Sequence, residues 1–169
     1  DIEYLFPFGW NEIEGIARRG DFDLSKHQEV SGKDLTYFDQ VKNEHVLPWV
    51  VEPAVGVDRT ALAFLAEAYT EEEINSAKGE LESRTVLKLD PRLAPIKVAF
   101  FPLIKKKPLQ DLAHRLQDET RLEWMTFYDE TGAIGRRYRR QDEAGTPYCV
   151  TVDFESLDDD SVTVRDRDT

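Results

Sequence analysis

Apolar and polar positions follow one another in blocks along the chain, and the blocks predict a series of strands and helices. Residues 4–17 alternate well enough to predict one long strand, with Glu12 on one face and Ile13 on the other. Residues 21–29 predict a short helix with Asp21 as its N-cap. The chain therefore opens with extended structure and then a helix.

Three further elements are predicted before the middle of the chain. Residues 35–46 are polar and predict a loop, whereas residues 47–52 form a nearly continuous apolar run that predicts a buried strand. Residues 60–69 carry apolar side chains at helical spacing and predict an amphipathic helix. The sequence Thr-Glu-Glu-Glu at residues 70–73 has a capping-box pattern, which predicts the start of another helix.

The second half of the chain alternates strands with helices after a proline-marked break at residues 90–95. The predicted elements are strands at 96–102, 124–128, 148–154 and 162–167 and helices at 109–121 and 134–144. This alternation predicts an α/β unit with a mostly parallel sheet that ends in an antiparallel hairpin. We therefore expect two domains, residues 1–90 and residues 91–169.

Composition and charge narrow the function. The chain has 169 residues, of which 40% are hydrophobic and 33% charged, as in ordinary globular proteins. The formal net charge of −12 argues against a non-specific nucleic-acid binder, although positive groups gather at residues 105–107 and 136–140. Specific recognition of RNA by such clusters stays open.

The single cysteine and the lengths of the apolar runs indicate the compartment. Cys149 stands alone, which excludes an internal disulfide and fits a reducing cytoplasm, so we expect a cytoplasmic protein with no membrane partner. Cys149 lies in an apolar strand, which favours a buried, inert thiol. His27, His45 and His114 are not at metal-ligand spacing, and the sequence identifies no metal ligands.

The segment 50–59 carries the most suggestive chemistry. A strand with the carboxylate of Glu52 leads through a turn at Gly56 to Arg59 in the first turn of a helix. Unpaired N–H groups and the positive dipole favour anions at a helix start, so an ammonium could bind Glu52 and a polyphosphate Arg59. The alternative is an ordinary strand–turn–helix corner, with Asp58 as an N-cap and Arg59 as a solvated charge.

Three separated blocks resemble the class II glycyl-tRNA synthetases. Residues 52–59, EPAVGVDR, resemble motif 3 of that family in its form E-P-[SA]-x-G-V-D-R. Residues 6–27 resemble F-P-F-G-W-x-E-[LI]-x-G-I-A-x-R followed by D-[YF]-D-L-x-x-H. Residues 132–153, GAIGRRYRRQDEAGTPYCVTVD, are similar to G-x-I-G-R-R-Y-R-R-Q-D-E-x-G-T-P-[YF]-C-V-T-V-D. The blocks occur in the family's order and cover most of the chain.

The resemblance implies an α+β and α/β fold class. Residues 1–90 would form part of the antiparallel-sheet catalytic core of a class II synthetase, and residues 91–169 a small α/β anticodon-binding domain with a mixed sheet. Nothing in the chain resembles motifs 1 and 2 of the family. We therefore expect a piece of a longer polypeptide, which is a homodimer as the full-length protein, and we expect the piece alone to be inactive.

The resemblance also implies a substrate site. ATP with Mg²⁺, glycine and tRNA(Gly) would be the cofactors and partners, with Glu52 holding the glycine ammonium and Arg59 the nucleotide, as the two catalytic residues. The implied glycine-binding residues are Glu52, Pro53, Ala54, Val55 and Gly56, and the implied ATP-binding residues are Glu12, Ile13, Gly56, Val57, Asp58 and Arg59. Ala54 departs from the serine of many family members and removes one hydroxyl from the glycine pocket.

Four arginines leave two interpretations open. The cluster consists of Arg136, Arg137, Arg139 and Arg140. Arg139 precedes Asp142 and Glu143 by three and four residues, which suits a self-paired, solvated helix face. Contact with the RNA backbone explains the cluster equally well, since arginine suits phosphates and base edges. If the cluster is only a helix face, the last strand, residues 163–167, is the other candidate surface for RNA.

Two rival functions accompany the glycine–tRNA ligase interpretation. A non-catalytic synthetase-like module would keep the fold for nucleic-acid binding or dimerisation, but it would have no need of Glu52 and Arg59. Another class II synthetase is the second rival, and the block at residues 6–27 disfavours it.

Overall fold

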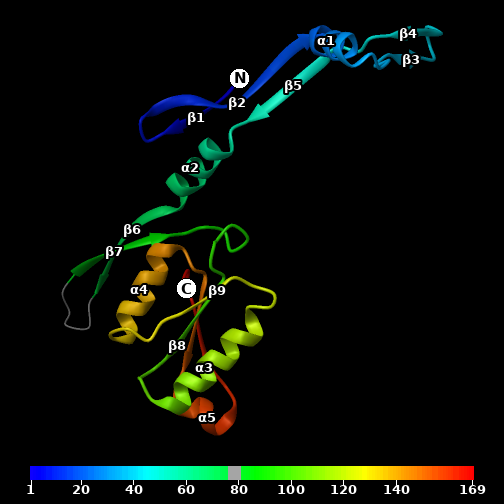
Figure 1. The fold of residues 1–169 in the computed structure, drawn as a ribbon. Helices are drawn as coiled ribbons and strands as arrows, with labels where there is room; N and C mark the ends of the chain where they lie inside the picture. The colour runs from blue at the N-terminus through cyan, green and yellow to red at the C-terminus, as the bar shows by residue number, and fades with distance from the viewer. Residues whose placement is uncertain (76–80) are drawn as a thin grey trace. The chain divides into compact units, whose positions relative to one another are not determined.

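A computed structural model describes residues 1–75 and 81–169 of the chain. These residues form two compact units, Asp1–Ala63 and Phe64–Thr169, and the division falls within helix α2, Val57–Ala68 (Figure 1). None of the helices in the described ranges combines the length and the hydropathy that a bilayer crossing requires.

The first unit is built on a three-stranded antiparallel sheet with the order β1-β2-β5. Its elements are β1 (Ile2–Phe6), β2 (Gly9–Gly20), α1 (Phe22–Ser31), β3 (Tyr37–Asp39), β4 (Glu44–Val46), β5 (Val50–Val55) and the first turns of α2. The three segments predicted to bind glycine and ATP therefore lie on β2, on β5 and at the start of α2.

The predicted single strand over residues 4–17 is wrong, because the chain reverses direction at Pro7 and Phe8 to form the β1–β2 hairpin. Gly9 follows the turn with φ of +112°, a conformation that residues with a Cβ rarely adopt. Proline and glycine in the turn thus override the alternation that would have continued one strand.

The next two elements differ in detail from expectation. The helix predicted over residues 21–29 is confirmed as α1, but the Asp21 side chain makes no capping hydrogen bond. The Asp21 carbonyl instead accepts from the backbone N–H of Ser25 at 2.9 Å. Residues 35–46, predicted as a loop, contain the short hairpin β3–β4, whose turn includes Asn43 with φ of +56°.

The strand predicted over residues 47–52 exists as β5, three residues further along, but it is not buried. Val51 and Val55 are 63% and 54% exposed. An apolar strand is buried only where another layer packs on it. Within the described residues of this unit, no other layer covers these two side chains.

The second unit contains a long hairpin and a four-stranded sheet with helices. Its elements are the last turns of α2, then β6 (Tyr69–Asn75), β7 (Leu81–Leu87), β8 (Val98–Pro102), α3 (Lys107–Thr120), β9 (Thr126–Tyr128), α4 (Ile134–Ala144), β10 (Tyr148–Val152), α5 (Glu155–Asp159) and β11 (Thr163–Asp166).

The helix start predicted at residues 70–73 is wrong, because this segment belongs to strand β6 and pairs antiparallel with β7. Ion pairs between the two strands explain why this segment forms a strand and not a helix. Glu72 lies opposite Arg84 and binds it at 2.5 Å, and it also binds Lys88 at 2.6 Å. Such pairing outweighs a local capping pattern.

The sheet of the second unit has the order β11-β10-β8-β9. Strands β10, β8 and β9 are parallel, and β11 pairs antiparallel with β10 at one edge. The predicted mixed α/β sheet is thereby confirmed, including its closing hairpin. The short helix α5 lies between β10 and β11, where the sequence analysis predicted no helix.

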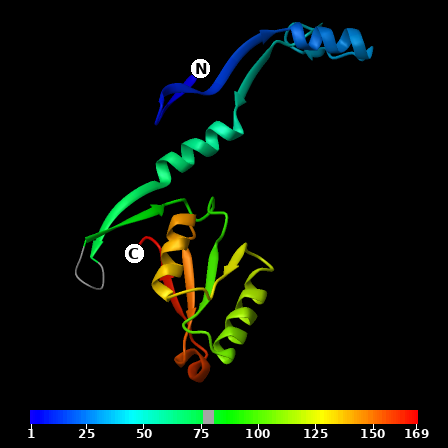
Figure 2. The same ribbon diagram turned by 60° about the vertical axis from the view of Figure 1, so that its left-hand side comes forward.

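Helices α3 and α4 cover opposite faces of this sheet (Figure 2). Ala99, Phe101 and Cys149 pack against Ile134 and Tyr138 of α4. The other face carries a second cluster, made by Leu109, Ala113 and Val152 with the half-buried side chains of Leu112, Leu116 and Tyr128. The two-residue period of the strands places alternate side chains in the two cores.

The proline-marked segment 90–95 lies within the second unit. Leu89 and Ala94 form a small core with Ala68, and Lys97 Nζ donates to the carbonyl of Pro91 at 2.6 Å. The domain boundary after residue 90 stays a prediction, since compactness alone does not define where each domain folds.

Candidate functional site

Two of the segments predicted to bind ATP meet in the first unit. Arg59, in the first turn of α2, donates a hydrogen bond from Nη1 to the backbone carbonyl of Glu12 on β2. The two residues are 47 positions apart in the sequence. A guanidinium has five N–H donors, so this contact fixes its position and leaves most of its donors for a ligand.

The turn between β5 and α2 is formed by backbone and side-chain bonds to Gly56. The backbone N–H and the hydroxyl of Thr60 both donate to the Gly56 carbonyl, at 3.0 and 2.9 Å. Asp58 lies in the first helical turn and is therefore not the N-cap. A Cβ at Gly56 would lie 3.8 Å from the Cβ of Arg59, an ordinary contact, so the fold itself does not require glycine there.

The segment predicted to bind glycine runs along an edge strand. Glu52, Pro53, Ala54 and Val55 pair in sequence with Ala17, Ile16, Gly15 and Glu14 of β2. Proline is tolerated because β5 is at the edge of the sheet within the described residues. All four side chains are exposed, so the pocket that the resemblance implies is open in this chain.

The Glu52 carboxylate has a cationic neighbour that the sequence analysis did not identify. Arg19 Nε lies 3.6 Å from Glu52 Oε2. Arg19 also donates from Nη2 to Asp23 Oδ1 at 2.9 Å and from Nε to Asp23 Oδ2. The hydrogen bond and the charge of Asp23, with a smaller contribution from Glu52, raise the pKa of Arg19, and Arg19 lowers the pKa of Asp23. Within the described residues, no hydrogen bond or ion pair joins Glu52 to Arg59.

The four arginines of α4 have different environments. Arg137 is only 2% exposed, and its guanidinium donates to the carbonyls of Pro102 at 2.6 Å and Gly132 at 3.0 Å. Arg137 therefore tethers α4 to the end of β8 and has no surface for RNA. Arg136 is exposed, and its side chain makes no hydrogen bond or ion pair to other residues in the described ranges.

Arg139 and Arg140 are ion-paired, but not within their own helix. Arg139 binds Glu82 of β7. Arg140 Nε donates to Asp129 Oδ2 at 3.1 Å, and Arg140 Nη2 donates to the Thr131 carbonyl at 2.7 Å. Burial raises the pKa of Asp129, but the amide N–H of Thr131 and the charge of Arg140 outweigh it and lower that pKa overall. Of the two interpretations left open, the one in which Arg139 pairs with Asp142 or Glu143 of its own helix is therefore wrong.

Asp142 is another charged side chain whose role sequence reasoning missed. It is 1% exposed and accepts two hydrogen bonds from Arg165 of β11, at 2.7 and 3.2 Å, and one from Arg84 of β7 at 3.4 Å. Burial would lower the pKa of Arg165, but the Asp142 carboxylate raises it overall. No local spacing reveals this pair, because Asp142 and Arg165 are 23 residues apart.

The arginines of the alternative RNA surface, on the last strand, also bind other parts of the protein. Arg167 is 3% exposed and donates to the carbonyls of Leu87, Leu89 and Gly145, each at 2.9 Å. Its guanidinium thus ties the end of the chain to the segment after β7 and to the end of α4. Together with the Asp142 contacts of Arg165, this leaves the 163–167 face poorly placed to offer its arginines to RNA.

Cys149 is buried, as predicted, and burial raises the pKa of its thiol to about 12. A thiol with so high a pKa stays protonated at neutral pH and is a poor nucleophile. No group of three or more His, Cys, Asp or Glu side chains in the described residues is placed to hold a metal ion.

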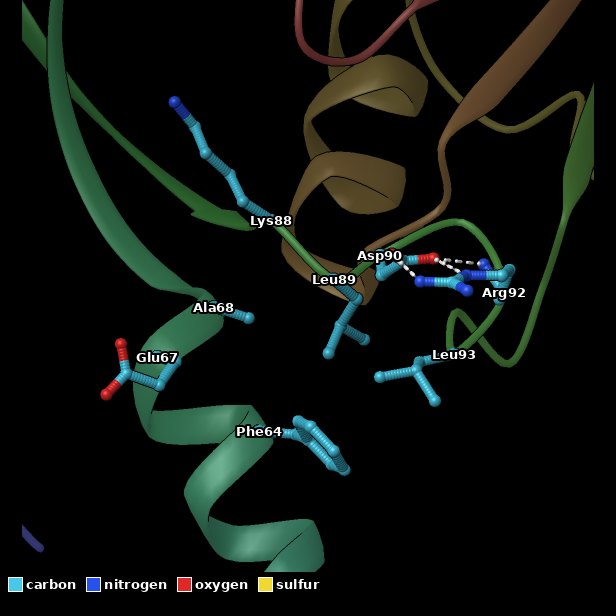
Figure 3. Close-up of a pocket in the computed structure, with 8 residues that line it drawn as sticks. All are labelled: Phe64, Glu67, Ala68, Lys88, Leu89, Asp90, Arg92 and Leu93. Carbon is cyan, nitrogen blue, oxygen red and sulfur yellow. Dashed lines mark hydrogen bonds and ion pairs between the residues drawn. The ribbon is translucent and has the colours of Figure 1, made fainter. Parts of the chain in front are cut away.

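A cavity of about 510 Å³ lies in the second unit, between the end of α2 and the segment after β7 (Figure 3). Its apolar wall includes Phe64, Leu89 and Leu93, and Asp90 binds Arg92 at its rim at 2.9 Å. None of the residues predicted to bind glycine, ATP or tRNA lines it. The cavity therefore adds nothing to the site on β2, β5 and α2.

Comparisons with known proteins agree with this architecture. Residues 97–169 match the family described as "Anticodon binding domain". Over 98% of its length the chain resembles the structure of the Giardia lamblia prolyl-tRNA synthetase in complex with prolyl-adenylate, with a TM-score of 0.58, 19% identity and 32% of that chain covered. At this identity the likeness concerns the fold alone.

Curated relatives give a closer match in sequence. The chain is 58% identical to the glycine–tRNA ligases of Streptomyces coelicolor and Clostridium perfringens, over 100% and 99% of its length. It is 56% identical to that of Bifidobacterium longum, over 100% of its length. The chain spans between 35% and 37% of the length of these three relatives.

The fold of the chain resembles that of part of a class II aminoacyl-tRNA synthetase, and its residues 97–169 match an anticodon-binding domain. Within that class, it is homologous to the glycine–tRNA ligases, the enzymes also called glycyl-tRNA synthetases. The resemblance noted in the sequence is thereby confirmed, while the roles of the individual site residues stay predictions.

Proposed function

We propose that this chain supplies the motif-3 part of the active site and the anticodon-binding domain of a glycine–tRNA ligase. The complete enzyme would activate glycine with ATP to glycyl-adenylate and transfer the glycyl group to tRNA(Gly). The observation that carries the proposal is the hydrogen bond from Arg59 to the Glu12 carbonyl, because it joins the two segments predicted to contact ATP.

Arg59 would stabilise the reacting phosphate. Activation joins the glycine carboxylate to the α-phosphate of ATP and releases pyrophosphate, and negative charge accumulates in the transition state. A fixed cation costs no reorganisation when that charge develops. The Glu12 carbonyl restrains the guanidinium, and the first turn of α2 offers backbone N–H groups to the same anion. Gly56, Val57, Asp58 and Ile13 would complete the nucleotide contacts.

Glu52 would bind the ammonium group of glycine. Its neighbours Pro53, Ala54 and Val55 would form the wall of a small pocket. Ala54 offers no hydroxyl to the substrate, so recognition in this chain would depend more on charge. A neutral hydrogen bond of that kind contributes about 0.5–1.5 kcal/mol.

ATP would be used as its Mg²⁺ complex. We assign no Mg²⁺ ligand to this chain, because its described residues contain no suitable cluster of three or more potential ligands. The complete protein would be a cytoplasmic homodimer.

The second unit would bind the anticodon stem-loop of tRNA(Gly). Support comes from the family match over residues 97–169 and from the exposed positive charge on α4. The proposed contacts are Arg136, Arg139 and Arg140. Arg137 is buried and cannot reach RNA. Arg139 and Arg140 would exchange their carboxylate partners for phosphates.

The decisive experiment compares Arg59→Ala with Arg18→Ala in the full-length protein. Arg18 is the control: it is another arginine of the first unit, on β2, and its guanidinium lies 4.2 Å from the centre of the Trp49 ring. We expect Arg59→Ala to reduce glycine-dependent ATP–pyrophosphate exchange by at least about a hundredfold, as loss of a transition-state donor does. Exchange by Arg59→Ala within a few-fold of wild type would overturn the proposal.

A further inference from the structure

An ion pair between an arginine and an aspartate lies beside the carboxylate that we assign to the glycine ammonium. Arg19 and Asp23 lie beside Glu52, and neither belongs to the predicted site. The three residues come from three elements: Glu52 from β5, Arg19 from the end of β2, and Asp23 from the first turn of α1.

A β-bulge explains how Arg19 reaches this position. In the ladder between β2 and β5, Arg18 pairs with Val51 and Gly20 with Val50, so Arg19 is the extra, unpaired residue. Bulges bend a strand and re-aim the side chain that they carry. Gly20, with φ of +65°, allows the backbone to turn directly into α1. The bulge and the turn bring the side chain of Arg19 to both carboxylates.

The guanidinium of Arg19 lies closer to the carboxylate of Asp23 than to that of Glu52. Arg19 donates two hydrogen bonds to Asp23, one of them at 2.9 Å, but its Nε is 3.6 Å from Glu52 Oε2. A separation of 3.6 Å is an ion pair and not a hydrogen bond. Glu52 is therefore held by charge alone, and its lone pairs stay available to another donor.

We propose that Arg19, held by Asp23, is a positioning residue that orients the Glu52 carboxylate for the glycine ammonium without occupying its hydrogen-bonding positions. Asp23 has two functions in this arrangement. It takes the hydrogen bonds of the guanidinium, and it balances the positive charge that would otherwise repel the substrate ammonium. This inference rests on the proposed function of Glu52.

Substitution of Asp23 and substitution of Arg19 should therefore affect glycine binding in different ways. Without Asp23, the guanidinium is free to form a bidentate pair with Glu52, which is among the strongest ion pairs available to a carboxylate. Arg19 would then compete with the substrate. Without Arg19, Glu52 loses its orientation but faces no competitor. Removing Arg19 should consequently relieve the defect caused by removing Asp23.

The test measures glycine-dependent ATP–pyrophosphate exchange by the full-length protein carrying Asp23→Asn, Arg19→Ala or both changes. We expect Asp23→Asn to raise the KM for glycine by about tenfold, and Arg19→Ala to raise it by about threefold. The double variant should resemble Arg19→Ala and not the product of the two effects. The KM for ATP should stay within about twofold of wild type in all three, since orienting Glu52 affects only the ammonium.

Two further variants separate positioning from folding. Glu29→Gln removes the partner of Lys26 in another exposed ion pair of α1, at 2.7 Å, and should leave both KM values unchanged. Arg19→Lys keeps the charge and should raise the KM for glycine less than Arg19→Ala does. It also provides a measurement if Asp23→Asn does not fold. A merely structural tether between β2 and α1 would instead lower stability and alter both KM values together.

The variant Glu52→Gln distinguishes failure of the proposed function from failure of this inference alone. If wild type shows exchange with glycine and Glu52→Gln abolishes saturation by glycine, the proposed function holds. Unchanged KM values in the Arg19 and Asp23 variants would then overturn only this inference, and so would additive effects in the double variant. If the wild-type protein shows no exchange with glycine, both the proposed function and this inference are wrong.

Discussion

Arg59 at the start of α2 donates a hydrogen bond to the backbone carbonyl of Glu12, on the middle strand of the first sheet. The contact uses the backbone of Glu12 and not its carboxylate, so it does not depend on the side chain at position 12. It follows that the Glu12 carboxylate remains available for another role.

Gly56→Ala should separate the binding role of this turn from its folding role. A Cβ at Gly56 would meet only Arg59, at an ordinary distance of 3.8 Å, and the backbone has no positive φ there. We therefore expect the melting temperature of the full-length protein to change little. If the nucleotide passes close to this backbone, the KM for ATP should rise by about tenfold or more, a cost of at least roughly 1.4 kcal/mol.

The control is Gly135→Ala on α4, where a Cβ meets nothing within 4 Å. Both the KM for ATP and the melting temperature of that variant should match wild type. Gly56→Ala with an unchanged KM for ATP would show that no ligand approaches this glycine.

Local patterns in the sequence predict most of the helices and strands of the second unit. Helix α4 begins and ends at the predicted residues, 134 and 144, and strand β10 begins at the predicted Tyr148. Apolar periodicity is reliable here because each element buries one face against a single sheet. The same reasoning failed at β6, where the preference for a helix over residues 70–73 was overridden by pairing with a distant strand.

The site itself was predictable only in part. The β5–α2 turn followed from the order of strand, glycine and helix, and its placement near Glu12 followed from the family resemblance. The Arg19–Glu52 pair did not follow, because a bulge shifts the register of β2 by one residue and no spacing rule gives bulges. The buried roles of Arg137 and Arg167 were likewise hidden, since their partners are backbone carbonyls from other elements.

Arg137→Ala should destabilise the protein, whereas Arg136→Ala should not. Truncation of Arg137 leaves the buried carbonyl of Pro102 and the carbonyl of exposed Gly132 without this donor. One unsatisfied buried carbonyl costs about 1–3 kcal/mol, so we expect a loss of roughly that size in the free energy of unfolding. Denaturant unfolding of the full-length protein measures it, with exposed Arg136 as the control. Equal, small losses in both variants would contradict the tethering role.

Gly145→Ala should be more damaging than Gly132→Ala. Both glycines have positive φ, +79° and +76°. A Cβ at Gly145 would approach Leu89 Cδ1 to 2.9 Å and the Leu87 carbonyl to 3.2 Å, whereas one at Gly132 would meet nothing within 4 Å. Backbone strain costs about 1 kcal/mol at each position, and overpacking adds roughly 1–3 kcal/mol only at Gly145. Thermal unfolding of the two variants should reveal this difference, and equal losses would contradict it.

The ion pairs of Glu72 should make stability depend on acidity. Lys88 and Arg84 lower the pKa of Glu72 from its ordinary value of 4.5, against a smaller opposing effect of burial. Because the folded-state pKa is below the unfolded one, the contribution is complete above about pH 4.5 and is lost as the pH falls through the folded-state pKa.

Glu72→Gln should therefore be less stable than wild type at pH 7, and the difference should shrink steadily below about pH 4.5. The measurement is the free energy of unfolding of both full-length proteins across that range. Glu123→Gln, which changes a carboxylate with no ion pair among the described residues, provides the control. A difference that does not vary with pH would show that the charge of Glu72 is not responsible.

The last prediction concerns recognition of RNA by α4. Of its four arginines, only Arg136, Arg139 and Arg140 are exposed, and the last two bind Glu82 and Asp129. RNA must displace those carboxylates, so each phosphate contact gains less than a free arginine would provide. Replacing the three with Gln should raise the KM for tRNA by roughly tenfold and reduce the salt slope of binding by up to about two. Exchange without tRNA should stay unchanged, since the first unit carries the proposed chemistry.

Arg115 and Arg121 supply the control, because they lie on and just after α3, outside the proposed contact. Their replacement by Gln removes two positive charges, against three in the α4 variant, and should leave the KM for tRNA within about twofold of wild type, because screening limits the effect of distant surface charges. If both sets of variants weaken tRNA binding equally, the effect is one of overall charge. If neither set weakens it, the arginines of α4 serve only to join that helix to β7 and to the loop after β9, and the anticodon must contact another surface.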